Sequence, residues 1–571
     1  MHHQKAEPHH SGTLLADGNS LTVEDVMDVA RHSRRVKLST DAAEKVAGCR
    51  AWVDHVVEEG KLTVYGLNTG FGSLAEVTVA QDMIETLSRN MIVSHSAGVG
   101  PPLAEEVVRA TMLIRANTLA KGYSGIRVTT LQTLLDMLNK GVHPVVPEKG
   151  SVGASGDLAP LSHLVLALSQ DIDGGEAFYE GRRMDSKEAM RKAGIDQVAL
   201  KAKEGLALNN GSTVSAALAT LALYDAEMLV KNAQIALGMS LEAMRGVSDA
   251  FHEKVQAARG HDGQIRCAAN VLRLLDGSEL IDSTKRVQDA YCLRCAPQVI
   301  GAVGDVLAFV RLVLSREINA ATDNPLIFLD LPPSRENKAI SCGNFHGEPV
   351  ALAMDMLSMA VAELGNISER RTFRLLDNTL SAGLPPMLVE ESGLNNGLMM
   401  AQYVAAALVS DNKTLAHPDS VDSIPTSANQ EDHVSMSTNA ARHAREVVWN
   451  VGQIVSIEML CAAQALDFRR AGLEFSTTRW HDDQEAGRTR KVVEYELKSG
   501  KVVNKAGLGK GTEAAHNAIR REIDHLSNDR PLYPDLERIA TMVHAGEILH
   551  AVEGALGSPL EGIGELFFKP Y

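Results

Sequence analysis

One short run in this sequence has backbone chemistry of its own. It is Ala154-Ser155-Gly156, within G-S-V-G-A-S-G-D-L-A-P-L-S-H at 150–163. If the chain bends tightly, the Gly156 amide nitrogen can attack the Ala154 carbonyl carbon, because glycine and alanine leave the approach open. Loss of two waters, including the Ser155 hydroxyl, then gives 4-methylideneimidazol-5-one (MIO), an electron-poor ring that captures amines. The alternative is a flexible loop that caps the helix expected near Leu161.

Other formal motif matches predict no second chemistry. G-L-G-K-G-T at 507–512 looks like a phosphate loop, but a glycine separates the lysine from the threonine. C-L-R-C at 292–295 lacks a second ligand pair, so buried thiols are favoured over a zinc site. G-A-S-G-D at 153–157 lacks the last glycine of a nucleophile elbow. We therefore expect no metal site.

The elements that position the loop are expected to be mainly helical. Of the 571 residues, 45% are hydrophobic and only 4% are aromatic, a composition that favours helix over an all-β fold. Residues 103–122 space apolar side chains three and four apart, between a proline pair and a glycine. The segments 213–245, 349–371 and 435–467 are long and largely apolar, as in the buried centre of an elongated helical bundle.

These patterns divide the chain into four predicted regions. The regions are a mobile N-terminal tail (1–20), a domain that carries the loop (21–210), a central long-helix bundle (211–470) and a C-terminal helical region (471–571). In the last region, the charged segment 488–510 predicts an exposed hairpin that turns at Ser499-Gly500, with a helical insertion as the alternative. Other subunits are expected to complete the apolar faces of the long helices.

The composition argues against several classes of partner. Lys and Arg number 56 and Asp and Glu number 72, so the net charge is −16, whereas nucleic-acid binding needs a basic face. No run of about 18 uninterrupted apolar residues predicts a membrane span, and the N-terminus lacks the apolar core of a secretion signal. Six cysteines do not make a disulfide framework. We therefore expect a cytoplasmic protein that acts on a small molecule.

Eight further blocks, in a consistent order, carry a resemblance to a known family. Together with 150–163 they resemble the MIO-dependent ammonia-lyases and aminomutases over roughly residues 20 to 470. The resemblance implies a mainly α, elongated bundle of the fumarase/aspartase-like type, and a homotetramer whose active sites draw residues from three chains. The blocks are Y-G-L-N-T-G-F-G at 65–72, S-H-S-A-G at 94–98, E-G-L-A-L-N-N-G at 204–211, Q-D-A-Y-C-L-R-C-A-P-Q at 288–298, T-D-N-P at 322–325, G-N-F-H-G at 343–347, S-E-R-R at 368–371 and Q-E-D-H-V-S at 430–435.

The resemblance also implies the reaction, which removes ammonia from an α-amino acid with loss of a β-proton. The MIO formed from Ala154, Ser155 and Gly156 supplies the electrophile, so no external cofactor is expected. Tyr65 resembles the catalytic base of the family, carried by a glycine-rich lid. A phenol has an ordinary pKa near ~10, so its surroundings must poise it for this role.

Further positions match residues that hold the substrate in the family. Arg294 resembles the arginine that binds the substrate carboxylate, for which a guanidinium fork is suited. Tyr291 lies three residues earlier, on the same side if the segment is helical, and is expected to assist catalysis at the MIO. The residues that resemble those bounding the MIO and the substrate are Asn210, Gln288 and Phe345.

The residues expected to recognise the side chain of the substrate are similar to those of the histidine ammonia-lyases. Glu431 stands where the phenylalanine and tyrosine enzymes commonly carry an amide, and its carboxylate suits an imidazole N–H but is costly beside a phenyl ring. His95 follows the Ser-His pattern of the histidine lyases. Met399 ends G-L-N-N-G-L-M at 393–399, which resembles their imidazole-pocket segment. The expected reaction is L-histidine to trans-urocanate and ammonia.

Departures from the histidine pattern keep alternatives open. Asn209 replaces the usual Ile beside Asn210, and Cys292 replaces a common Ser. A phenylalanine or tyrosine ammonia-lyase, or a 2,3-aminomutase, is the first alternative. The others are a helical scaffold without the MIO and, more distantly, a serine hydrolase.

Overall fold

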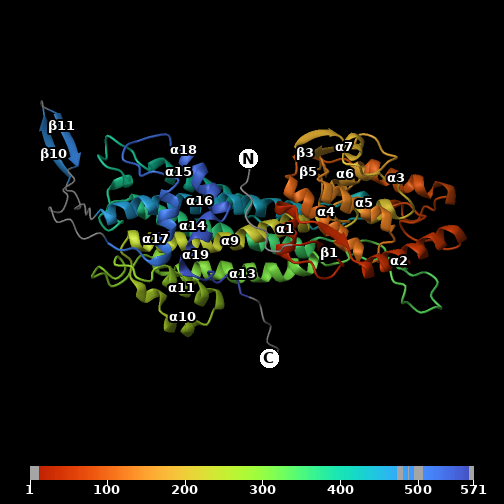
Figure 1. Ribbon diagram of the computed structural model, residues 1–571, viewed down its shortest axis with the longest axis horizontal. Helices are drawn as coiled ribbons and strands as arrows, with labels where there is room; N and C mark the ends of the chain where they lie inside the picture. The colour runs from red at the N-terminus through yellow and green to blue at the C-terminus, as the bar shows by residue number, and fades with distance from the viewer. Residues whose placement is uncertain (1–11, 472–479, 486–487, 494–505, 565–571) are drawn as a thin grey trace.

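The computed structural model describes residues 12–471, 480–485, 488–493 and 506–564, and it is elongated and mainly helical (Figure 1). The helices of the N-terminal part are α1 (Val23–His32), α2 (Thr40–Glu59), α3 (Ile84–His95), α4 (Glu105–Ala120), α5 (Val128–Lys140), α6 (Leu158–Leu168), α7 (Ser186–Lys192) and α8 (Glu204–Asn209). Those that follow are α9 (Thr213–Ala243), α10 (Glu253–Arg259), α11 (Asp262–Leu274), α12 (Tyr291–Arg294), α13 (Ala296–Glu317), α14 (Glu348–Leu376), α15 (Met399–Leu415), α16 (Ser437–Arg470), α17 (Lys510–Arg520), α18 (Tyr533–His544) and α19 (Glu547–Leu556). Short 3-10 turns are η1 (Gly72–Leu74), η2 (Gln81–Met83), η3 (Ser248–Phe251), η4 (Pro386–Leu388) and η5 (Ser427–Asn429).

Short strands decorate the bundle. They are β1 (Leu14–Ala16), β2 (Val36–Leu38), β3 (Val99–Pro102), β4 (His143–Pro144), β5 (Pro147–Lys149), β6 (Glu176–Tyr179), β7 (Arg182–Asp185), β8 (Leu326–Ile327), β9 (Ala339–Ile340), β10 (Trp480–Glu485) and β11 (Arg488–Val493). β1 pairs in parallel with β2, with Leu14 opposite Val36, and the other pairs are antiparallel. The prediction of a mobile tail over 1–20 is therefore wrong for 14–16, where Leu14 and Ala16 are buried against the core.

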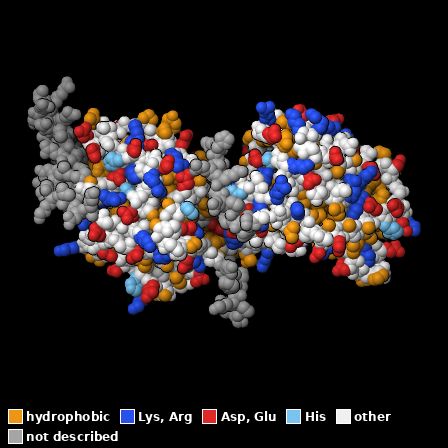
Figure 2. Space-filling view, viewed as in Figure 1, with side chains coloured by type: hydrophobic (Ala, Val, Ile, Leu, Met, Phe, Trp, Pro, Cys, Tyr) orange, Lys and Arg blue, Asp and Glu red, His pale blue; other side chains and the backbone are white. Residues whose placement is uncertain are grey.

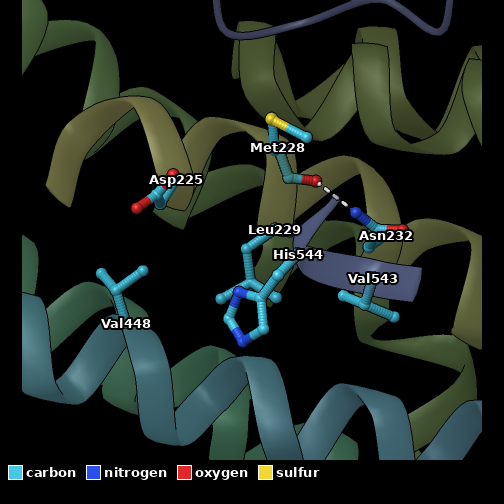
Figure 3. A pocket seen from close by; sticks show the side chains of 7 residues that line it. All are labelled: Asp225, Met228, Leu229, Asn232, Val448, Val543 and His544. Carbon is cyan, nitrogen blue, oxygen red and sulfur yellow. Dashed lines mark hydrogen bonds between the residues drawn. The ribbon is translucent and has the colours of Figure 1, made fainter. Parts of the chain in front are cut away.

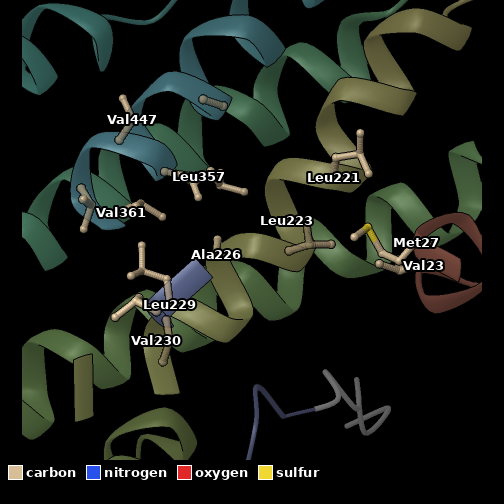
Figure 4. Close-up of a cluster of buried hydrophobic side chains, with 14 of the residues drawn as sticks. Val23, Met27, Leu221, Leu223, Ala226, Leu229, Val230, Leu357, Val361 and Val447 are labelled. Atoms are coloured by element: carbon tan, nitrogen blue, oxygen red, sulfur yellow. The ribbon is translucent and has the colours of Figure 1, made fainter. Parts of the chain in front are cut away.

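The four helices expected from the apolar patterns are confirmed with small shifts of their ends. They are α4, α9, α14 and α16. α9, α14 and α16 pack against one another, and Figure 4 shows Leu223 of α9, Val361 of α14 and Val447 of α16 in this core. α9 has no proline and few charges, so it can be buried around almost its whole circumference.

Four helices are long and apolar enough, by length and composition, to cross a membrane: α9, α13, α14 and α16. Each of these helices contains an apolar stretch of 18 residues, of which 89% is buried in α16 and 78% in α9. The corresponding share is 61% for α14 and 44% for α13. The apolar length of α9 and α16 therefore serves the core of the chain, whereas α13 and α14 keep apolar faces uncovered.

The charged segment begins with β11, which pairs antiparallel with the preceding strand β10, and Trp480 lies opposite Val493. The ladder ends with Glu485 opposite Arg488, and the expected turn at Ser499-Gly500 lies outside the described residues. On the face shown in Figure 2, acidic and basic side chains are interspersed rather than gathered by sign.

Candidate active site

The Ala-Ser-Gly loop is bent tightly. Gly153, Ser155 and Gly156 all have positive φ, at 69°, 53° and 75°, a region that costs energy for serine. The bend presses Gly156 against Gly211: a Cβ on Gly156 would lie 2.3 Å from backbone atoms of Gly211. The amide of Asp157 donates to the Gly211 carbonyl at 2.8 Å. The loop therefore has the close backbone approach that cyclisation of 154–156 requires.

The beginnings of several long helices hold this loop. The amide of Gly347, just before α14, donates to the Gly153 carbonyl at 3.1 Å, and that of Met436, just before α16, donates to the Val152 carbonyl at 2.8 Å. α6 begins directly after Asp157. Helix N-termini carry partial positive charge, so their convergence makes the site favourable for negative charge.

Asp157 is a structural centre of the site that the sequence reasoning did not single out. Its carboxylate is fully buried and accepts hydrogen bonds from Ser151 Oγ at 2.8 Å, Ser215 N at 2.8 Å and Thr438 Oγ1 at 2.6 Å. These donors lie in the loop, on α9 and on α16. An aspartate directly before a helix after a glycine-rich run is the signal that points to such an anchor.

Next to Gly211 and the loop lie four buried charged side chains, two basic and two acidic. Arg115 is fully buried, and its Nη1 would lie 2.7 Å from a Cβ on Gly211. Burial lowers the pKa of Arg115 to about 10, while Asp323 and Asp157 act in the opposite direction. Lys203 Nζ lies 2.9 Å from Asp323 Oδ2, both buried. These groups fix the Gly211 side of the loop.

Ser155 contacts two of the residues proposed from the sequence. Its hydroxyl donates to Glu431 Oε1 at 2.6 Å, and its carbonyl accepts from Asn210 Nδ2 at 2.7 Å. The second Glu431 oxygen accepts from Thr426 Oγ1 at 2.6 Å. Among the described residues, the buried Oδ1 of Asn210 has no hydrogen-bond partner. Asn209 instead donates to Ser162 Oγ of α6 at 3.0 Å.

Tyr65 belongs to the same candidate site as Ser155 and Glu431. Its hydroxyl oxygen accepts from the Gly72 amide at 3.2 Å, and its ring meets Phe71 edge-on. Gly72 has φ 53°, and a Cβ there would lie 2.6 Å from Ser427 Oγ, so the tyrosine loop packs on the loop that leads to Glu431. Burial raises the pKa of Tyr65; the Gly72 amide lowers it and the Glu431 charge raises it.

His95 and Phe345 flank the loop without a direct bond to it. The Nδ1 of His95, at the end of α3, lies 2.8 Å from the Met91 carbonyl and 2.9 Å from Ser94 Oγ. Gly98, three residues after His95, packs against the start of the loop: a Cβ on Gly150 would lie 3.1 Å from Gly98 Cα. Phe345 is half-buried, two residues before the Gly347 amide that binds the loop.

A second cluster gathers on α12. Arg294 Cζ lies 4.6 Å from the centroid of the Tyr291 ring, which agrees with the expected helical side. Arg294 Nε donates to the Asp289 carbonyl at 2.9 Å. Within the described part of the chain, no acidic side chain pairs with Arg294. Tyr291 is 71% exposed, and Gln288 is exposed as well.

The two clusters lie at opposite ends of the bundle. Gly347, at the start of α14, binds the Ala-Ser-Gly loop, whereas Arg371, near its end, donates to the Cys292 carbonyl of α12. At 1.5 Å per residue, these points on α14 are about 36 Å apart. Met399 belongs to the distant end, because Gln402, three residues after it, bonds Glu369 of α14 at 2.9 Å. One chain therefore does not bring Ser155 and Arg294 to the same small molecule.

One small cavity among the described residues lies apart from the candidate site. This cavity between α9, α16 and α18 begins about 18 Å along α9 from Thr213, and Figure 3 shows its lining: Asp225, Met228, Leu229, Asn232, Val448, Val543 and His544. No three or more His, Cys, Asp or Glu side chains of the described residues are grouped to hold a metal ion. The six cysteines are free thiols.

Long core helices converge on the strained Ala-Ser-Gly loop. A family model described as aromatic amino acid lyase matches residues 21–494, and the chain belongs to this family. It is therefore a carbon–nitrogen lyase.

Relatives and solved structures agree with this assignment over nearly the whole chain. Histidine ammonia-lyase of Caldanaerobacter subterraneus is 51% identical over 94% of this chain and 97% of its own length. The histidine ammonia-lyase structure from Trypanosoma cruzi is 37% identical, with a TM-score of 0.82, and covers 95% of this chain and 96% of that one. Tyrosine aminomutase from Streptomyces globisporus is 34% identical, with a TM-score of 0.85, over 96% and 100%. The fold is thus shared by lyases and aminomutases.

Proposed function

We propose that this chain eliminates ammonia from L-histidine to give trans-urocanate, with MIO formed from Ala154, Ser155 and Gly156. The observation that carries the proposal is the contact between Ser155 and Glu431, which places a carboxylate beside the reacting loop. The histidine ammonia-lyases that are about half identical over nearly the full length support the same substrate.

The residues present fit the MIO group. The positive φ of Ser155 and Gly156 and the close approach of Gly211 give the bend that ring closure needs. Asn210 Nδ2 already donates to the Ser155 carbonyl, so it can hold the oxygen of the closed ring. When formed, MIO supplies an electrophile for the substrate amine and makes ammonia a better leaving group.

Glu431 is suited to read the imidazole. Its Oε1 is held toward Ser155, and Thr426 fixes its other oxygen. An imidazole N–H can donate to this carboxylate, whereas a phenyl ring offers it no donor and leaves a charge uncompensated. We place His95 and Phe345 around the same substrate, with Met399 contributed by another subunit.

Tyr65 is the proposed base, which takes the β-proton at its hydroxyl oxygen. Because burial raises its pKa, the phenol is protonated at neutral pH in the free chain. The base therefore works best at alkaline pH, or when substrate binding lowers its pKa.

Arg294 is the proposed carboxylate holder. Its Nε is engaged by a backbone carbonyl, so both terminal amino groups can face a carboxylate bidentately. Tyr291 assists beside it, and Gln288 bounds the site.

The separation of the two clusters makes the proposal depend on assembly. We propose a homotetramer in which α12 of one chain faces the Ala-Ser-Gly loop of another. Exposed apolar side chains on α14 and α15 supply surface for such contacts. They are Leu352, Met359, Phe373, Met400, Tyr403 and Val404. Six free thiols fit the reducing cytoplasm as the location of the enzyme.

Incubation with histidine, phenylalanine and tyrosine tests the function. We expect urocanate from histidine at the highest kcat/KM, with cinnamate, coumarate and β-amino acids separated by the same chromatography. A β-amino acid as the main product would replace the lyase with an aminomutase. Intact mass tests the ring: closure makes the chain lighter by two waters, about 36 Da, and a full-mass chain without activity would favour the scaffold.

A further inference from the structure

Asp289 is a buried carboxylate beside the proposed substrate arginine, and it takes no part in the proposed chemistry. Its side chain is 2% exposed. Oδ2 accepts from the Val247 amide at 2.7 Å, and Oδ1 lies 3.1 Å from Arg286 Nη2. Arg286 in turn donates to the Met244 carbonyl at the end of α9. Asp289 therefore ties the segment before α12 to the turn that follows a core helix.

The backbone of the same residue holds the substrate arginine. Arg294 Nε donates to the Asp289 carbonyl at 2.9 Å, and the guanidinium lies over the Tyr291 ring. Fixing Nε sets the plane of the guanidinium and leaves Nη1 and Nη2 as the two arms of the fork. Any shift of the Asp289 carbonyl rotates that fork, and bidentate recognition depends on its plane.

We propose that Asp289 is a positioning residue for substrate carboxylate binding, which acts through Arg294. The carboxylate of Asp289 anchors its own backbone to the buried end of α9, and that backbone orients the arginine. The short helix α12 is only four residues long, so it has little rigidity of its own. The anchor supplies the rigidity. This inference rests on the proposed function only in taking Arg294 as the carboxylate holder.

The chain offers a matched control. Asp282 accepts from the amide of Ser248 at 2.9 Å and from its hydroxyl at 2.7 Å, in the same turn that Asp289 binds. It has no bond to Arg294. Asp282→Asn therefore perturbs the turn without touching the arginine, and asparagine tolerates the left-handed backbone of this position (φ 57°).

The experiment measures full-length Asp289→Ala, Asp289→Asn and Asp282→Asn. Two competitive inhibitors are compared, 3-(imidazol-4-yl)propionate, which carries a carboxylate, and imidazole, which does not. For Asp289→Ala we expect KM for histidine and Ki for the carboxylate inhibitor to rise about tenfold, with kcat changed less than about threefold. Ki for imidazole stays unchanged. Asp289→Asn keeps an acceptor for Val247 and shows a smaller rise, and Asp282→Asn resembles the parent.

A double substitution separates positioning from general damage. On an Arg294→Ala background, Asp289→Ala should cause no further rise in Ki for the carboxylate inhibitor. An equal further rise, or weakened binding of both inhibitors, would overturn the proposal. If Asp289→Ala fails to fold, Asp289→Asn with an unchanged Ki for the carboxylate inhibitor overturns it as well. If the parent enzyme consumes phenylalanine or tyrosine instead of histidine, the histidine proposal fails alone. The same kinetic test then runs with that substrate, because its carboxylate is common to all three.

Discussion

The hydroxyl of Ser155 donates a hydrogen bond of 2.6 Å to Oε1 of Glu431, although 276 positions separate them in the chain. In the proposed ring closure, this hydroxyl leaves as one of the two waters. Closure would then release the carboxylate oxygen from its serine partner as the electrophile forms. The released oxygen would be available to accept the imidazole N–H of the proposed substrate.

Replacing Ser155 with alanine should abolish turnover without unfolding the chain. The electrophile requires the serine hydroxyl as a leaving group, whereas the fold depends on the surrounding helices. Intact-mass measurement should show the full, uncyclised mass, and thermal denaturation should be close to that of the parent. Ser334→Ala, at an exposed position of the segment between β8 and β9, is the control and should keep both the mass deficit and the activity. Full turnover by Ser155→Ala would remove Ser155 from the mechanism.

Replacing Glu431 with glutamine should change substrate choice and pH dependence together. The amide cannot accept from imidazole as strongly, so kcat/KM should fall about tenfold or more for histidine and much less for phenylalanine. Burial and the Glu431 charge both raise the pKa of Tyr65, so removing the charge lowers it. The ascending limb of kcat/KM against pH should then move to lower pH. Asp432→Asn, at the neighbouring position, is the control. Equal losses of kcat/KM for histidine and phenylalanine would show that Glu431 does not recognise the imidazole.

Breaking the buried ion pair between Arg371 and Glu458 should destabilise the bundle strongly. Both side chains are fully buried, Arg371 Nη2 lies 2.7 Å from Glu458 Oε2, and Ser240 and Ser368 donate to the same carboxylate. Arg371→Met leaves a buried charge unpaired, which costs about 3–5 kcal/mol. Denaturant unfolding measures the loss.

The control for this pair lies on the same helix. Glu363 is exposed and accepts from Asn366 Nδ2 at 2.9 Å, so Glu363→Ala should change the free energy of unfolding by under about 1 kcal/mol. Combining Arg371→Met with Glu458→Leu should recover part of the loss, because no lone charge remains. A double variant with a lower free energy of unfolding than Arg371→Met alone would refute this account.

Replacing Asp529 with alanine should loosen the segment that carries Met399. The Asp529 carboxylate accepts from the amides of Asn396 and Gly397, each at 2.8 Å, and α15 has no side-chain cap of its own. We expect faster hydrogen exchange at these two amides and a rise of about threefold to tenfold in KM for histidine. Asp535→Asn, whose carboxylate pairs with Arg530 instead, is the control. Unchanged exchange at 396–397 would show that the tether does not order the segment.

The sequence predicts the class of fold well, because long apolar segments without proline leave few alternatives to a helical core. It also brings Ser155, Asn210 and Glu431 into one hypothesis, and the structure places them in contact. It does not reveal that Arg294 lies at the other end of α14, since spacing along a chain carries no information about helix direction in space. Asp289 was overlooked for a related reason: its anchor, Val247, is 42 positions away.

In the proposed tetramer each active site combines residues of different chains, so an inactive chain also affects sites that it builds with its neighbours. A chain damaged at Ser155 spoils a site that borrows a sound α12, and a chain damaged at Arg294 spoils a site with a sound loop. Two different inactive chains, refolded together, can nevertheless complement each other, and random mixing would restore up to roughly a quarter of the sites.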